Sequence, residues 1–293
     1  MIGRYLTDKL LKNNHKVGWL SRSEKDNDHE DVRIFNWDIE IKEGDTEAVE
    51  WCDQIIHLAG AGVADKRWSD QRKKMILESR TKSATFLQEL ITKADSKPEC
   101  VISASAVGYY GFKTSDEVLD EQSEPGDDFL AQVTEKWELM TRSFSDLNVR
   151  SAQIRIGIVL SNEGGAMVEM LKPPVLAPLG SGKQWMPWIH IEDLASIFMH
   201  CLANKNVKGP YNAVAPDQVT NKEFTELLAR ASGKTYSGIK VPAFALKAMV
   251  GEMAGMLLNG TRISNKKIKD SGFEFQYKDL KSALNQLFQT KIE

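Results

Sequence analysis

The sequence predicts an α/β fold with a doubly wound parallel sheet and a smaller C-terminal lobe. Three observations lead to this prediction. Short runs rich in Val, Ile and Leu alternate with longer segments of helical spacing through the first half of the chain. These runs are continuous rather than alternating, which is typical of parallel strands that helices cover on both faces. The second half replaces this alternation with paired glycines and prolines, which mark loops and short elements.

The predicted elements follow in order along the chain. Strands are expected at 16–20, 33–35, 54–58, 100–103 and 153–160, each bounded by polar residues or glycine. Helices are expected at 68–93, 128–144, 192–202, 221–231, 242–257 and 280–288. We therefore predict that residues 1–160 form the main domain and that 186–210 return to it. Residues 161–185 and 211–293 then form the smaller lobe.

Composition excludes several classes of protein. Of the 293 residues, 42% are hydrophobic and 27% are charged, which is ordinary globular composition. The 38 basic and 41 acidic residues leave a net charge of −3, so we expect no nucleic-acid partner. The most apolar stretch, 241–258, is interrupted by Lys247 and Glu252, so we expect no membrane span. Three scattered cysteines argue against a disulfide framework or a metal site and fit the reducing cytoplasm.

The amino terminus opens directly into a helical pattern with Gly3 at its start. Doubly wound sheets that bind dinucleotides begin with an apolar strand and a glycine-rich turn that leads into such a helix. In this chain Gly3 matches the last glycine of that turn, and we expect the strand and the rest of the turn to be missing. The alternative is that Gly3 is an ordinary glycine at a helix start.

Two predicted strand ends carry candidate ligand contacts. Ser21 and Arg22 follow the first strand, where an arginine accommodates the 2′-phosphate of NADP(H). The alternative is a solvated loop arginine. Leu58 and Ala59 follow the strand at 54–58 and lead into glycines that let a ligand approach the backbone. Here the alternative is a tight turn between a strand and a helix.

Hydroxyl groups crowd just past the strand at 100–103. Ser105, Tyr109 and Tyr110 are our candidate catalytic residues, because a serine can bond a substrate oxygen and a tyrosine can pass a proton to it. The alternative is a polar turn whose tyrosines pack on the core. His57 lies in an apolar strand, and we expect it to be a core histidine rather than a catalyst.

The chain resembles the extended short-chain dehydrogenase/reductases, and more closely their atypical epimerase family proteins (the SDR39U1-like, YfcH-like group). The resemblance covers nearly the whole chain. It rests on 2–6, 20–22, 57–60, 79–80, 103–111, 129–130, 137–138, 155–160, 180–185, 188–194, 212–216 and 272–273. The last of these belongs to a tail similar to that group's C-terminal domain of unknown role.

This resemblance implies a Rossmann-like NADP(H)-binding domain over 1–160 and a substrate lobe beyond it. By position, the cofactor contacts would be Gly3, Ser21, Arg22, Leu58, Ala59, Arg80 and Val159. The superfamily works with a Tyr and a Lys four residues apart, and the matching positions here hold Phe129 and Val133. The usual acid/base pair is therefore absent, and Tyr109 or Tyr110 would have to replace it.

Three functions remain open. The first is an NADP(H)-dependent oxidoreductase or nucleotide-sugar-type epimerase acting on an unknown small molecule. The second is a protein that binds or senses NADP(H) without turnover, because Phe129 and Val133 replace the working pair. The third is a partner-binding protein that has lost the cofactor with its shortened start. The resemblance also implies a homodimer.

Overall fold

The core of the protein is a four-stranded parallel sheet with the strand order β12-β7-β5-β4. The computed structural model describes residues 1–22, 31–290 and 292. The four strands are β4 (Gln54–His57), β5 (Cys100–Ala106), β7 (Arg150–Ile156) and β12 (Gly209–Ala213). β5 and β7 lie in the middle, and all but their end residues are buried. The predicted fold class, with continuous apolar strands between two layers of helices, is confirmed.

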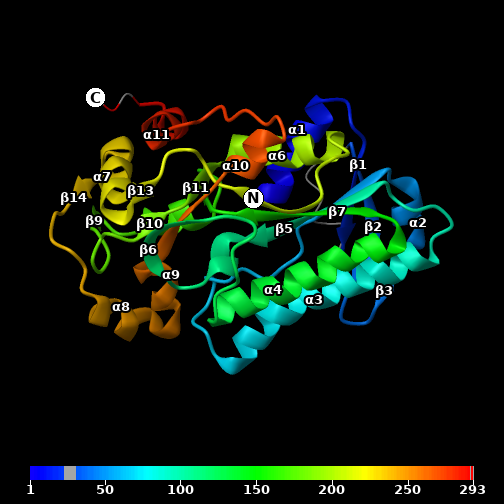
Figure 1. The fold of residues 1–293 in the computed structure, drawn as a ribbon, viewed down its shortest axis with the longest axis horizontal. Coiled ribbons are helices and arrows are strands. Elements are labelled where there is room, and N and C mark those ends of the chain that lie inside the picture. The colour runs from blue at the N-terminus through cyan, green and yellow to red at the C-terminus, as the bar shows by residue number, and fades with distance from the viewer. Residues whose placement is uncertain (23–30, 291, 293) are drawn as a thin grey trace.

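Helices cover both faces of this sheet (Figure 1). α3 (Asp70–Lys93) and α4 (Phe129–Arg142) lie together on one face, and α1 (Ile2–Lys12) and α6 (Ile191–Ala203) lie on the other. The apolar side chains of α1 and α6 share one core with the sheet, and α3 packs in another. Alternate residues of each strand therefore face different helices.

The first strands form a separate sheet. β1 (Val17–Ser21) pairs in parallel with β2 (Val32–Asp38), which pairs antiparallel with β3 (Glu43–Gly44). β1 ends this sheet and β4 ends the larger one, so each has one edge without a hydrogen-bonded strand among the described residues. Among the described residues no strand pairs with both β1 and β4, so the parallel strands of the main domain are divided between two sheets.

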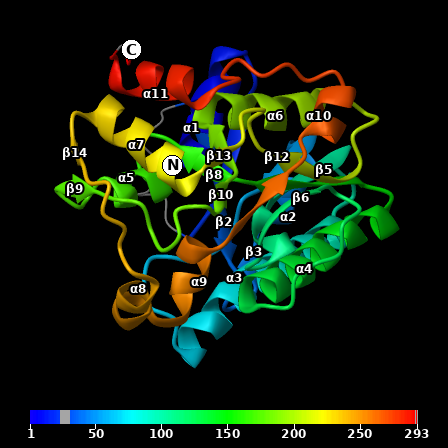
Figure 2. The same ribbon diagram turned by 60° about the vertical axis from the view of Figure 1, so that its left-hand side comes forward.

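The smaller lobe has its own apolar core around α7 (Asn221–Ser232) and α11 (Leu280–Phe288). α8 (Ala243–Val250) and α9 (Ala254–Leu258) follow and lie beside the start of α3 (Figure 2). An ion pair between Lys73 of α3 and Glu252 joins the two regions. The domain boundaries predicted from the sequence stay a prediction.

Short elements complete the chain. They are α2 (Thr46–Trp51), β6 (Thr114–Leu119), β8 (Ile158–Leu160), α5 (Ala166–Met170), β9 (Val175–Leu176), β10 (Trp185–Met186), β11 (Trp188–His190), β13 (Val219–Thr220), β14 (Thr235–Tyr236), β15 (Gly260–Ile263) and α10 (Lys266–Asp270). Single turns of 3-10 helix lie at η2 (Val107–Tyr110), η3 (Ser143–Leu147) and η4 (Gly251–Met253).

Two expected elements are interrupted, and a glycine stands at each break. The strand expected at 153–160 divides into β7 and β8 at Gly157, where a Cβ atom would overlap the carbonyl oxygen of Pro187. The helix expected at 242–257 divides into α8, η4 and α9 at Gly251, whose φ of +63° a side chain would strain. Within the described ranges, no helix is long and apolar enough to cross a membrane.

Candidate functional site

The first candidate contact lies where β1 ends. Ser21 is the last residue of β1, and Arg22 follows it with an exposed side chain. In a doubly wound sheet this strand end approaches the adenosine ribose of a bound dinucleotide. A guanidinium group suits a phosphate on that ribose because it is always charged and donates through a planar fork. The structure therefore places Arg22 where the sequence predicts it.

The start of α1 is a second candidate contact. No side chain caps this helix at Met1, so the N–H groups of its first turn and its positive dipole end are available to an anion. A Cβ atom on Gly3 would lie 3.6 Å from the side chain of Leu58, so the helix start lies beside the end of β4. Tyr5 and Lys9 both donate to Glu192, which holds α1 against α6.

Arg80 of α3 supports the loop after β4. Its Nη1 donates to the carbonyl oxygens of Ala61 at 3.0 Å and Ile76 at 2.9 Å, and its guanidinium carbon lies 4.9 Å from the ring centroid of Trp137. Burial, with the nearby charge of Arg72, lowers the pKa of Arg80 to about 10. The described residues supply no carboxylate partner to Arg80. A half-buried cation without an acidic partner favours binding of an anion.

The remaining predicted cofactor contacts lie close to these. Ala59 follows Leu58 at the start of the loop that rests on Arg80. Val159 is the middle residue of β8 and packs in the same core as Leu6 of α1. The structure thus gathers Gly3, Leu58, Ala59, Arg80 and Val159 around the sheet ends and the start of α1. Their roles as cofactor contacts stay a prediction.

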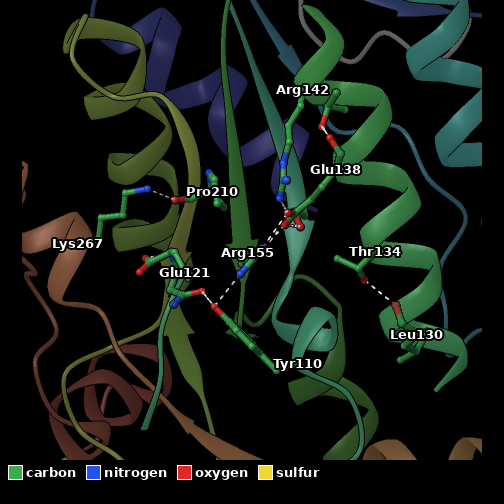
Figure 3. A network of polar contacts seen from close by, with 12 residues as sticks. Tyr110, Glu121, Leu130, Thr134, Glu138, Arg142, Arg155, Pro210 and Lys267 are labelled. Carbon is green, nitrogen blue, oxygen red and sulfur yellow. Dashed lines mark hydrogen bonds and ion pairs between the residues drawn. The ribbon is translucent and has the colours of Figure 1, made fainter. Parts of the chain in front are cut away.

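Two of the three predicted catalytic hydroxyls, those of Ser105 and Tyr110, lie in a buried network, part of which Figure 3 shows. Ser105 donates to Oε1 of Glu138 at 2.7 Å. Arg155 binds the same carboxylate through Nε and Nη2, at 2.7 and 2.9 Å. Tyr110 donates to Oδ1 of Asn212 at 2.7 Å and accepts from Nη1 of Arg155 at 3.0 Å. All five side chains are at most 4% exposed.

Charge and burial set the protonation of this network. Burial alone would raise the pKa of Glu138, but the hydrogen bonds and charge of Arg155 hold it below its usual range. Burial raises the pKa of Tyr110 to about 12, against the opposing charge of Arg155. A tyrosine in this state holds its proton and directs it to Asn212. The geometry favours a structural role for Ser105 and Tyr110, and their catalytic role stays a prediction.

Tyr109 differs from its neighbour. Its ring lies against the guanidinium of Arg155, with the centroid 3.4 Å from Cζ, and meets the ring of Tyr110 edge-on. Its side chain is only 9% exposed and packs with Tyr110 in one apolar cluster, and its hydroxyl makes no hydrogen bond within the described part of the chain. Of the three predicted catalytic residues, Tyr109 is therefore the one whose hydroxyl is not bonded to a described side chain.

Sequence reasoning did not single out Arg155 or Glu138 as site residues. The available signal was a charge inside the apolar run that became β7, since a buried charge requires a partner. The partner itself could not be identified, because Glu138 lies on α4 and comes into contact only when that helix packs on the sheet.

The positions that match the superfamily's Tyr and Lys lie on α4. Phe129, at its first position, meets the ring of Trp68 at 4.9 Å and lies 5.2 Å from the Nζ atom of Lys73. Val133, one turn later, is buried. Neither side chain can exchange a proton, so this part of the site packs instead of reacting.

These features first define the class of fold: an α/β protein of Rossmann type, a fold that binds dinucleotides at the carboxyl ends of its strands. A family model described as the NAD dependent epimerase/dehydratase family matches residues 1–132. A second model, a domain of unknown function (DUF1731), matches residues 241–287.

Similar proteins identify the family within this class of fold. The epimerase family protein YfhF of Bacillus subtilis is 33% identical over 290 residues, covering 98% of this chain and 94% of that protein. The chloroplastic SDR39U1 homolog of Arabidopsis thaliana is 37% identical over 295 residues, covering 98% and 84%. Human SDR39U1, solved with NADPH, superposes with a TM-score of 0.86 at 31% identity, covering 99% and 96%. The chain belongs to the epimerase family proteins of the NAD dependent epimerase/dehydratase family.

Proposed function

We propose that this protein binds NADP(H) across the carboxyl ends of its strands and is an atypical short-chain dehydrogenase/reductase of unknown substrate. The observation that carries the proposal is the exposed Arg22 directly after β1. Human SDR39U1 supports it, because that protein was solved with NADPH and shares the fold along nearly the whole chain.

The residues present fit such a cofactor. Arg22 and Ser21 would hold the 2′-phosphate, and the N–H groups at Gly3 would meet the diphosphate. Arg80 would supply positive charge beside Leu58 and Ala59, since no described carboxylate neutralises it. When bound, the nicotinamide ring would supply a carbon that gains or loses a hydride.

The proton chemistry of such a reaction limits the choice of residues. Phe129 and Val133 hold no transferable proton, and the hydroxyls of Ser105 and Tyr110 are bonded to Glu138 and Asn212. Tyr109 is the candidate whose hydroxyl makes no hydrogen bond to a described residue. If the protein is an oxidoreductase or epimerase of this kind, we therefore expect Tyr109→Phe to slow turnover and to leave NADPH binding unchanged.

A second candidate function follows from the same observations. A protein that binds NADP(H) without turnover needs the cofactor contacts and has no use for a proton donor. The buried bonds of Ser105 and Tyr110 favour this reading. Incubating the protein with NADPH and a panel of carbonyl compounds and nucleoside diphosphate sugars separates the two. Consumption of NADPH, or conversion of a sugar, supports the enzyme, and unchanged nucleotide and sugars support the binding protein.

The binding experiment tests the proposal itself. We expect calorimetric titration to give tighter binding of NADPH than of NADH. Arg22→Ala should weaken NADPH binding about tenfold to a hundredfold, the size of one or two charge-assisted hydrogen bonds, and leave NADH binding unchanged. Arg33→Ala is the matched control, because Arg33 is an exposed arginine on the neighbouring strand β2. If Arg22→Ala and Arg33→Ala bind NADPH equally well, Arg22 does not select the cofactor.

A further inference from the structure

Three buried polar side chains stand in register across the main sheet. His57 of β4 pairs with Ser103 of β5, and Ser103 pairs with Gln153 of β7. Register partners in a parallel sheet point to the same face, and these share it with Arg155, on the side of α4. His57 is 6% exposed and the other two are fully buried. Each has one polar atom without a hydrogen-bond partner among the described residues: Nδ1 of His57, Oγ of Ser103 and Oε1 of Gln153.

The bonds of Ser83 decide the tautomer of His57. The Ser83 hydroxyl donates its single proton to the carbonyl oxygen of Arg80 at 2.9 Å. With that bond made, its contact with Nε2 of His57, at 3.0 Å, is one that it accepts. His57 thus carries its proton on Nε2. Its Nδ1 atom is an acceptor, and nothing in the described structure donates to it.

The hydrogen bonds of Ser151 fix the orientation of the Gln153 side-chain amide in the same way. The hydroxyl of Ser151 donates to the carbonyl oxygen of Thr141 at 2.6 Å, so it accepts from the side-chain amide of Gln153 at 2.7 Å. This orients the amide with Nε2 toward Ser151. Oε1 of Gln153 is therefore a second buried acceptor without a donor.

Between these two acceptors lies a single donor, the hydroxyl of Ser103. One hydroxyl proton can satisfy at most one acceptor, so direct bonds cannot satisfy this row. Serine is also the smallest of the three side chains. Because neighbouring strands lie about 4.8 Å apart, His57 and Gln153 stand on strands about 10 Å apart, with only the small serine side chain on the strand between them. Buried polar groups in such a position are normally satisfied by a water molecule with about three hydrogen bonds.

We propose that one water molecule is bound here as part of the fold, held by His57, Ser103 and Gln153. It accepts from the hydroxyl of Ser103 and donates to Nδ1 of His57 and to Oε1 of Gln153. This arrangement uses both protons of the water and leaves none of the three side-chain atoms without a partner. His57 directly precedes Leu58, and Ser83 bonds the carbonyl of Arg80, so the water also braces the base of the proposed cofactor site.

A high-resolution crystal structure of the full chain tests this site directly. We expect an ordered water within hydrogen-bond distance of all three atoms. A structure in which the hydroxyl of Ser103 bonds Nδ1 of His57 directly, with no water beside Gln153, would overturn the proposal.

Nitrogen NMR of His57 gives a second test in solution. In the parent protein Nδ1 should show the resonance of an unprotonated nitrogen, moved upfield because it accepts a hydrogen bond. Ser103→Val replaces the hydroxyl with methyl groups, which displace the water, and should move that resonance downfield. Ser145→Ala, at an exposed serine, is the control and should leave it unchanged. A proton on Nδ1, or an unmoved resonance in Ser103→Val, would refute the water site. Neither the crystal structure nor the NMR measurement requires NADP(H), so both test the water site even if the protein does not bind that cofactor.

Discussion

Replacing Glu138 with Gln tests the buried network most directly. The Glu138 carboxylate accepts two bonds from Arg155, one from Ser105 and one from Arg142. A glutamine keeps the shape but removes the negative charge and points an N–H₂ group at other donors. The guanidinium of Arg155 is fully buried and would lose its ion-pair partner. Breaking a buried pair in this way destabilises a protein by about 3–5 kcal/mol.

The assay is urea unfolding followed by circular dichroism, with the midpoint and slope compared between variants. Glu117→Gln is the control, because Glu117 pairs with Lys113 in solvent at 3.1 Å and should contribute less than about 0.5 kcal/mol. A double variant, Glu138→Leu with Arg155→Met, should lose less than the single change, since no charge remains unpaired. A loss below about 1 kcal/mol for Glu138→Gln would show that Arg155 does not depend on this carboxylate.

Three further predictions follow. The pKa of Glu138 is lower in the folded protein than in the unfolded chain, so the ionised carboxylate stabilises the fold above the unfolded pKa, and this stabilisation is lost as pH falls through the folded pKa. The urea midpoint of Glu138→Gln should therefore fall less between about pH 5 and 3 than that of the parent protein. Gly157→Ala should lower stability by about 1–3 kcal/mol through overlap with Pro187, whereas Gly238→Ala, in open space, should not; equal midpoints would contradict this. Amide hydrogen exchange should be faster in β4, which has one paired edge, than in β5, which has two; equal protection would show that β4 is covered.

Local patterns predicted the elements of the main domain well. β4 and β5 lie at the expected runs, and α3 and α4 lie within the expected helical segments. Such elements are readable because burial on one or both faces imposes a hydrophobic period on nearby residues. The break of the last run at Gly157 was not readable, because the cause is the backbone of Pro187, thirty residues away.

Only part of the candidate site could be predicted, because local sequence patterns do not reveal contacts between residues that are distant in the chain. Arg22 could be placed because it immediately follows a strand, and the position of a strand end is a local property. The environment of Ser105 and Tyr110 could not, because it depends on Arg155 and on the packing of α4. A list of hydroxyls past a strand end does not reveal which of them face solvent.

The sequence by itself determined the alternation of strands and helices, since this pattern depends on residues a few positions apart, and it shows that Phe129 and Val133 carry no transferable proton. Only the tertiary structure decided that Ser105 and Tyr110 are bonded to buried partners and that His57, Ser103 and Gln153 share one face. These contacts join strands and helices distant in sequence. Their hydrogen bonds depend on the register and on which face each side chain takes, and sheet assembly alone sets both.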